Sequence, residues 1–250
     1  MSLFHGPAPV LSGLILYLDA ANPKSYPGSG TAWFDLSGSN NHFTLYNSPT
    51  LAQGALNFNG SNQYARSTQT LNLSVYSYAT VEIWFKVNSA GYVGMVLEHT
   101  GNWNSNSGGF GLYSNSNGGS PVTNLHHTNH NSLPSSSPSG GARNYLATMG
   151  TQFTQHVNQF SKANDSTGRL TYVNSLLTAY DVNTGGGSYG TETATTTSMS
   201  LANDYLYLAS RGGGSLWLSG QISIVKVYAA KLSQDLISQN FNATRGRYSL

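Results

Sequence analysis

Short apolar segments recur along this chain, and stretches rich in Gly, Ser, Asn and Pro separate them. Residues 79–87 are the clearest case, because apolar side chains there alternate with Glu82, Trp84 and Lys86. A period of two residues is typical of a strand with one face on the core. No regular succession of strand and helix patterns follows, so we expect a sandwich or barrel and not a parallel α/β sheet.

The predicted strands cover residues 14–18, 56–60, 79–87, 153–160, 169–177, 205–209 and 216–228. One short helix is expected near the C-terminus, with Ser233 as N-cap and Asp235 in its first turn. Leu232 is placed to pack on Ile237 as a hydrophobic staple. A turn at 164–168 predicts a hairpin between two of the strands.

We expect one domain over residues 1–250, since sandwiches of this length commonly fold as one unit. Residues 1–12 are expected to form an N-terminal arm and residues 243–250 a C-terminal tail. Residues 101–141 are so rich in Ser, Asn and Gly that they predict long loops or a loosely ordered insertion.

The chain carries few charges: 8% of its residues are Asp, Glu, Lys or Arg, and the net charge is +2. Binding to nucleic acid or to anionic membranes needs clustered Lys and Arg, so neither partner is expected. Neutral polar surfaces suit hydroxyl-rich ligands and close packing against other subunits. The chain has no Cys, which excludes disulfides and thiolate metal sites.

The first nine residues contain two prolines and no Lys or Arg, which argues against a secretory signal. The apolar run 11–18 is too short to span a bilayer. We therefore expect a protein made in the cytoplasm, with no membrane insertion.

Six segments, in order, resemble concanavalin A-like, laminin-G-like jelly rolls. They are 16–22 (LYLDAAN), 33–38 (WFDLSG), 56–61 (LNFNGS), 80–85 (TVEIWF), 169–174 (RLTYVN) and 218–228 (LSGQISIVKVY). The resemblance implies an all-β antiparallel sandwich, with a closing strand followed by the short C-terminal helix. It implies a tight turn after residue 174.

Two further segments, 18–31 (LDAANPKSYPGSGT) and 239–248 (QNFNATRGRY), resemble virion structural proteins of tailed bacteriophages, notably marine and cyanobacterial ones. That resemblance implies a non-enzymatic decoration, tail or adhesion protein whose partners are other virion proteins or copies of itself. Lysis would then release the virion from the host cytoplasm. The tail residues expected to contact neighbouring subunits are Arg245, Arg247 and Tyr248.

The chain departs from the jelly-roll family at two positions: Ser223 stands where relatives often carry Asp, and Ser175 where they often carry Gly. The first change removes a carboxylate suited to calcium, whereas the second affects a turn. By family analogy Asp19, Asp35 and Asn59 are candidate calcium ligands. Alternatively, Asp19 and Asp35 cap turns through bonds to the backbone.

Glycan sites combine aromatic platforms with planar amides and hydroxyls. The candidates of this kind on apparent loops are Asn102, Trp103, Asn104, Tyr113 and Asn115. Bacterial surface polysaccharide is therefore a possible ligand of the loops of the sandwich. Trp103 packing a loop onto the domain is the equal alternative, and Trp217 is assigned to strand core.

Three histidines, His126, His127 and His130, are spaced so that they could hold a transition metal. A polar loop is the alternative interpretation, because no carboxylate lies near them in sequence. The role of this cluster is left open.

Hydrolysis of glycosides needs two carboxylates facing each other across the bond. No two of the nine acidic residues lie two or four positions apart on one predicted strand, and Glu82 is expected to pair with Lys86 or to bond at a rim. The leading hypothesis is therefore a virion structural or adhesion protein. A carbohydrate-binding lectin-like module, with or without calcium, is the alternative, and a glycoside hydrolase is the second.

Overall fold

A computed structural model describes residues 7–89, 94–100, 109–117, 120–127, 147–148, 151–162, 169–180 and 201–250. At 113–117, 120–127, 147–148, 169 and 178–180 the description is of the backbone. Nearly all regular structure in these residues is β-strand. No helix in the described part of the chain has the length and apolar composition needed to cross a membrane.

The first antiparallel sheet has the strand order β15, β14, β13, β8, β18, β5, β4, and β1 also pairs with β18. The bounds of these strands are β1 Leu14–Asp19, β4 Thr50–Ala52, β5 Ala55–Asn59, β8 Tyr78–Val87, β13 Thr154–Ser161, β14 Arg169–Val173, β15 Leu176–Tyr180 and β18 Ser219–Tyr228.

The second antiparallel sheet has the order β12, β11, β10, β9, β17, β6, β3, β2. Its strands are β2 Ala32–Trp33, β3 Phe43–Tyr46, β6 Tyr64–Ser67, β9 Gly94–His99, β10 Phe110–Asn117, β11 Ser120–His127, β12 Ala147–Thr148 and β17 Leu206–Leu208. A small pair, β7 Leu71–Asn72 and β16 Asn203–Asp204, lies outside both sheets.

The main core fills the space between the two sheets. On β8 the residues Val81, Ile83 and Phe85 point into it, and the second sheet contributes Phe43, Phe110 and other buried side chains. Burying large apolar side chains between facing sheets is the main favourable term in folding such a sandwich. The chain is thus an all-β sandwich of the concanavalin A-like jelly-roll class, as predicted.

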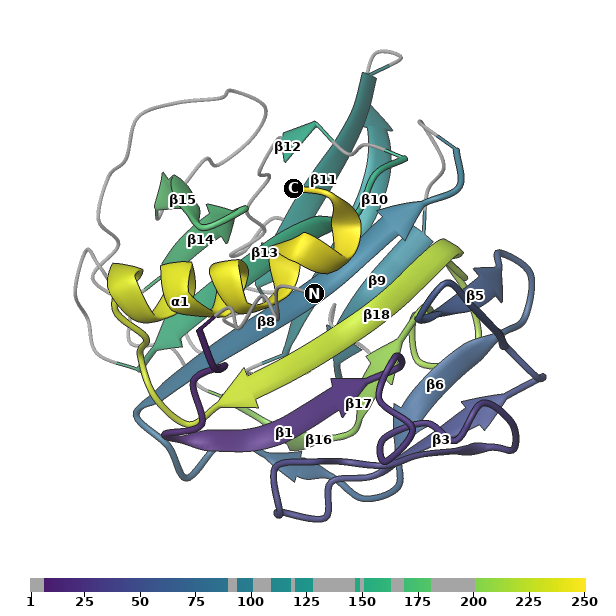
Figure 1. The fold of residues 1–250 in the computed structure, drawn as a ribbon, viewed down its shortest axis with the longest axis horizontal. Coiled ribbons are helices and arrows are strands. Elements are labelled where there is room, and N and C mark those ends of the chain that lie inside the picture. The colour runs from purple at the N-terminus through teal and green to yellow at the C-terminus, as the bar shows by residue number, and fades with distance from the viewer. Residues whose placement is uncertain are drawn as a thin grey trace, which may run out of the picture.

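Helix α1, Gln234–Thr244, covers the other face of the first sheet. Figure 1 shows it lying across β8 and β13. Ser233 caps it by accepting a hydrogen bond from the Leu236 amide, and Asp235 is in the first turn, as predicted. Leu232 and Ile237 share a second apolar cluster under the helix, so the expected staple is confirmed.

The predicted strands are confirmed, with two changes in extent. Residues 169–177 divide into β14 and β15, because Asn174 and Ser175 have φ of 49° and 64° and form the implied tight turn. Strand β18 begins at Ser219 and not at 216, because Leu216 has a φ of 47°, which no extended strand allows.

The expectation of loops over residues 101–141 is wrong for two segments, since β10 and β11 pair there as an antiparallel hairpin. Pairing uses backbone groups, so Ser and Asn do not prevent it. Phe110 and Leu112 alternate into the core and anchor β10. The apolar alternation that marks a strand is therefore present in β10, but it covers only a few residues.

His156 lies on the core face of β13, with its ring centroid 5.0 Å from that of Phe85. It is 1% exposed, and its Nδ1 has no hydrogen-bond partner among the described residues. Burial lowers the pKa of His156 from 6.5 to about 3. The imidazole is therefore neutral in the folded protein.

Acidification should destabilise the fold through this histidine. Below pH 6.5 the unfolded chain binds a proton at His156 that the folded chain does not, so the free energy of unfolding falls by about 1.4 kcal/mol per pH unit from this residue. Urea denaturation between pH 6 and 4, below the unfolded pKa and above the folded one, measures the slope. The His156→Leu variant should show a shallower slope by that amount, and an unchanged slope would contradict a buried neutral imidazole.

Candidate functional site

The candidate site forms where β18 changes partners. One edge of β18 pairs with β5 over residues 219–222 and with β1 over 224–228. Against β8, the register shifts between Ile222 and Ile224, which makes Ser223 the extra residue of a β-bulge. The Ser223 carbonyl accepts a hydrogen bond from the Ala20 amide at 2.8 Å, so the bulge joins β18 to the end of β1.

A two-residue turn between β4 and β5 forms the second wall. Gln53 and Gly54 have φ of 53° and 74°, the signature of a type I′ hairpin turn. The Ser223 hydroxyl donates to the Gly54 carbonyl at 2.9 Å. Gln53 adopts a left-handed conformation that costs an ordinary side chain about 1–2 kcal/mol. Its amide makes no hydrogen bond within the described part of the chain.

The C-terminal turn η1, Arg245–Tyr248, forms the third wall. Nη1 of Arg247 donates to both carboxylate oxygens of Asp19, at 2.8 and 2.9 Å. Asp19 is 1% exposed, whereas the Arg247 side chain is 44% exposed. Burial alone would lower the pKa of Arg247, but its hydrogen bonds to Asp19 and the charge of that carboxylate outweigh burial and raise it.

Tyr248 closes the floor of the site. Its ring stacks on Trp84 at 4.9 Å and on Phe153 at 4.4 Å between centroids. Its hydroxyl donates to the Ser223 Oγ at 2.5 Å. Burial raises the pKa of Tyr248, so the phenol stays protonated.

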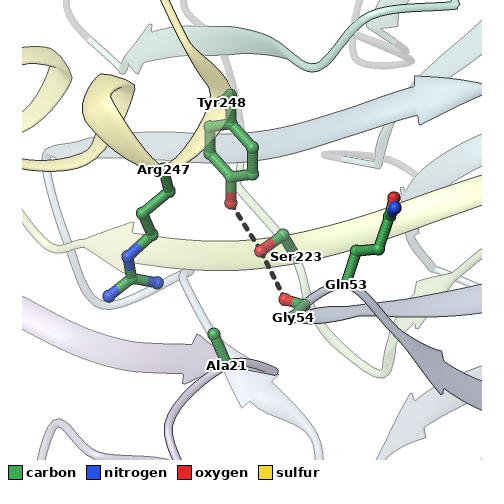
Figure 2. A pocket seen from close by; sticks show the side chains of 6 residues that line it. All are labelled: Ala21, Gln53, Gly54, Ser223, Arg247 and Tyr248. Atoms are coloured by element: carbon green, nitrogen blue, oxygen red, sulfur yellow. Dashed lines mark hydrogen bonds between the residues drawn. The ribbon is translucent and has the colours of Figure 1, made fainter.

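Together these walls enclose a pocket of about 360 Å³. Figure 2 shows Arg247 and Gln53 on either side of it, with the chain of hydrogen bonds from Tyr248 through Ser223 to Gly54 between them. Ala21 completes the lining. Small-molecule sites are usually about 300–1,000 Å³, so the pocket is large enough for one small polar ligand.

The lining has a definite hydrogen-bonding pattern. The Tyr248 hydroxyl donates to Ser223, and the Ser223 hydroxyl donates to the Gly54 carbonyl. Because both hydrogens are used within this chain, the oxygens of Tyr248 and Gly54 offer lone pairs to a ligand, whereas Ser223 is 0% exposed and links them. Arg247 uses one guanidinium nitrogen for Asp19, which leaves N–H groups on the others. The pocket thus presents acceptors on its floor and donors at its sides.

A buried ion pair supports this site from below. Glu82 on β8 lies directly opposite Lys226 on β18, and their charged groups are 3.3 Å apart with 0% and 1% exposure. Three further donors reach the Glu82 carboxylate: Trp84 Nε1 at 3.0 Å, Gln155 Nε2 at 3.0 Å and Asn240 Nδ2 at 2.8 Å.

Asn240 of α1 also binds the N-terminal arm. Its Oδ1 accepts a hydrogen bond from the Val10 amide at 2.8 Å, and its Nδ2 donates to the Tyr228 hydroxyl at 2.9 Å. Tyr228 in turn donates to the Val10 carbonyl at 3.2 Å. One buried amide therefore joins the arm, the helix and the sheet.

The expected pairing of Glu82 with Lys86 is wrong. Residues four apart on one strand are about 13 Å apart, whereas the antiparallel register places Lys226 directly across from Glu82. The Lys86 Nζ lies instead 5.2 Å from the centroid of the Phe153 ring. Glu82 is also not a rim residue, because α1 covers it.

The candidate calcium ligands are engaged in separate hydrogen-bond networks. Asp19 accepts from the Ala21 amide and from Arg247, and Asp35 accepts from the amides of Tyr17, Ser37 and Asn41. Asn59 accepts from the amides of the turn that follows it. Bonds from Asp19 and Asp35 to nearby backbone amides are what the turn-capping alternative predicts. No group of three acidic or His side chains suited to a metal occurs among the described residues.

The glycan candidates Asn102, Trp103 and Asn104 lie outside the described residues, as does His130. Tyr113 and Asn115 belong to β10, and His126 and His127 to β11, so their backbones are in strands and not in loops. Trp217, assigned to strand core, is partly buried just before β18 begins.

The tail residues fold back on their own domain. Arg247 and Tyr248 contact Asp19, Trp84 and Ser223, as described above, whereas Arg245 is exposed and reaches the Leu250 carbonyl at 3.4 Å. Their contact with neighbouring subunits stays a prediction. The sequence interpretation missed Gln53, Gly54 and Ala21, although a Gly after Gln between two apolar runs is a recognisable hairpin signal.

Comparison with known protein families matches no family model, and no curated protein sequence matches the chain. Solved structures do match. A sialidase from Trypanosoma rangeli, in complex with 2,3-difluorosialic acid, is 15% identical over 97% of this chain and 35% of its own, with a TM-score of 0.57. These likenesses concern the fold.

Two botulinum neurotoxin domains are also similar. The receptor-binding domain of the C/D mosaic serotype is 12% identical over 94% of this chain and 52% of its own, with a TM-score of 0.62. The serotype D binding domain is 15% identical over 94% and 53%, with a TM-score of 0.59. The chain therefore spans from about a third to about half the length of these proteins.

Replacing Glu82 by Gln should destabilise the protein by about 3–5 kcal/mol, because it leaves the Lys226 ammonium buried without its counter-charge. Urea denaturation measures the loss. Glu82→Gln combined with Lys226→Met should recover much of it, and Asp235→Asn on the exposed side of α1 is the control. A loss under about 1 kcal/mol for Glu82→Gln would show that the pair is not buried as described.

Proposed function

We propose that this protein is a non-enzymatic carbohydrate-binding module. The pocket beside the Ser223 bulge, called the bulge pocket below, would hold a neutral sugar. The hydrogen-bonding pattern of the lining carries the proposal. Sugar hydroxyls both donate and accept, so they can use the floor acceptors and the side-wall donors together. The lone pairs of the floor would repel an anion. Arg247 would attract an anion only weakly, because Asp19 already balances its charge.

The likeness of fold supports a binding role. Among the similar structures are a Trypanosoma rangeli sialidase in complex with sialic acid and a botulinum neurotoxin DC binding domain in complex with SialylT. Those proteins place sugar sites on chains that include this kind of sandwich. Transfer of a sugar-binding role to this chain is part of the proposal.

The state of the nearby carboxylates favours binding over hydrolysis. A glycosidase needs one carboxyl to give a proton and a second to act as nucleophile or base. Glu82 is buried beneath α1 and paired with Lys226, and Asp19 is held by Arg247. Neither is placed to reach a glycosidic bond in the pocket.

We further propose that the module is carried on the virion of a tailed phage and assembles with copies of itself or with other virion proteins. The resemblance of two segments to such proteins supports this. Exposed leucines on the outermost strands of the first sheet also support it: Leu51 on β4 is 39% exposed, and Leu176 and Leu177 on β15 are 70% and 47% exposed. Apolar edge strands favour pairing with another chain.

Titration with neutral saccharides tests the pocket. We expect saturable binding of a neutral oligosaccharide from a bacterial-polysaccharide panel, measured by calorimetry. Gln53→Asn keeps the left-handed turn but withdraws the amide, so it should weaken binding by about tenfold, the equivalent of one hydrogen bond.

Gln152→Asn, an exposed Gln outside the lining, is the matched control. Binding should persist in EDTA, because Arg247 already occupies the Asp19 oxygens; loss in EDTA would instead support calcium. Absence of binding across the panel, or equal affinity in Gln53→Asn, would refute the sugar site.

Light scattering tests assembly. The wild-type protein should form a discrete oligomer or a filament as its concentration rises, and the double change Leu176→Lys, Leu177→Lys should shift the mass toward the monomer. Val75→Lys is the control, because Val75 is 67% exposed but lies on neither sheet edge. A wild-type monomer at all concentrations would contradict self-assembly through these edges.

A further inference from the structure

The outer face of the second sheet carries a cluster of tyrosines around one arginine. Tyr46 on β3 lies opposite Tyr64 on β6, and their rings are parallel within 2° at 4.4 Å between centroids. Arg66 follows two residues after Tyr64 and therefore points to the same face. Its guanidinium carbon lies 5.6 Å from the Tyr46 ring centroid and 4.7 Å from that of Tyr205.

Within the described residues, no carboxylate lies against the Arg66 guanidinium. The side chain makes no ion pair and no hydrogen bond there, and it packs against the rings of Tyr46 and Tyr205. Its Nε is buried without an acceptor. By contrast, the buried Lys226 and the partly exposed Arg247 each have a carboxylate partner.

A buried charged donor without an acceptor is unfavourable in the free protein. Such a group regains its hydrogen bonds when a ligand brings an anion to it. The tyrosine rings hold the guanidinium in place through cation–π contacts, so little side-chain freedom is lost on binding. The unpaired Arg66 is therefore suited to a ligand and not to the stability of the sheet.

The platform is rigid yet accessible. Gly213 has a φ of 77° and lies so close to Tyr64 that a Cβ there would be 3.0 Å from two ring carbons. The turn at 212–214 thus supports the Tyr64 ring. Tyr46, Tyr64, Arg66 and Tyr205 are all partly exposed, so solvent reaches each of them.

The chemistry of this cluster defines a ligand class. Aromatic rings stack on the C–H faces of sugars, and the planar guanidinium fork binds a carboxylate through two parallel hydrogen bonds. Burial raises the pKa of Tyr64, so its hydroxyl stays a donor at neutral pH. We propose that this face, which we call the Tyr-Arg platform, binds a saccharide that bears a carboxylate.

This site is independent of the bulge pocket. The Tyr-Arg platform lies on the second sheet, whereas the pocket is built on the first sheet and the C-terminal turn. The two sites also differ in charge, because Asp19 neutralises Arg247 whereas no described carboxylate neutralises Arg66. A variant can therefore lose ligand binding at one site and keep it at the other.

Calorimetric titration of the full chain tests the Tyr-Arg platform with two acidic probes, oligogalacturonate and sialyllactose. Their neutral counterparts are methyl-esterified oligogalacturonate and lactose. At least one acidic probe should bind with a Kd at least about tenfold lower than its counterpart, and its affinity should fall as salt is raised.

Arg66→Gln should abolish the preference for the acidic probe, and Arg66→Lys, which keeps the charge but not the fork, should retain part of it. Arg245→Gln, at an exposed arginine far along the chain, is the matched control and should bind as wild type. Circular dichroism confirms that each variant folds. Gln53→Asn should leave acidic-probe binding unchanged, which separates this site from the pocket.

Three results with the saccharide probes would overturn the proposal. They are no binding of either acidic probe, equal affinity for acidic and neutral probes, and an Arg66→Gln variant that binds like wild type. Inorganic sulfate or phosphate binding as tightly as the best saccharide would also overturn it, since the tyrosines would then contribute nothing.

Discussion

The buried carboxylate of Glu82 is the group on which the outer layer of this protein depends. An isolated charge in that position would be strongly unfavourable, so it persists only because Lys226 and three neutral donors all reach it. These partners come from three strands and from the helix. Asn240 extends the same network to the N-terminal arm, and Trp84 provides the surface on which Tyr248 stacks. Pocket geometry therefore follows from how this one charge is satisfied.

Sequence reasoning identified the strands of the first sheet other than β4, because alternation is a local property, but in the second sheet it identified only β17. The face of β8 with Glu82, Trp84 and Lys86 shows its limit. Their polarity predicts a surface, whereas a helix some 150 residues later covers Glu82 and Trp84. The cap at Ser233 revealed the helix, but nothing local says where a helix docks. Strands β10 and β11 were missed because strand pairing uses backbone groups and needs few apolar side chains.

The candidate site was less predictable than the fold. Ser223 stood out as a departure from the family, whereas Arg247 and Tyr248 were predicted to contact neighbouring subunits and not to line a pocket. Only the bulge, which a single extra residue creates, turns Ser223 toward them. The hairpin that brings Gln53 and Gly54 is visible in sequence, but its approach to a strand about 170 residues away is not. Non-local register makes such a pocket, and a sequence pattern does not encode register by itself.

Scarcity of charge makes the remaining charges informative. In a chain with 8% charged residues, a long-range field contributes little to attracting a ligand, so recognition must come from short-range contacts. Lys226 and Arg247 form ion pairs within the protein, so they cannot discriminate between ligands by charge. Among the described residues, no carboxylate balances the charge of Arg66, which lies against the rings of Tyr46 and Tyr205. If both proposed sites bind sugars, one of them would take neutral residues and the other acidic residues, so a polysaccharide that carries both could be held at two places on the domain.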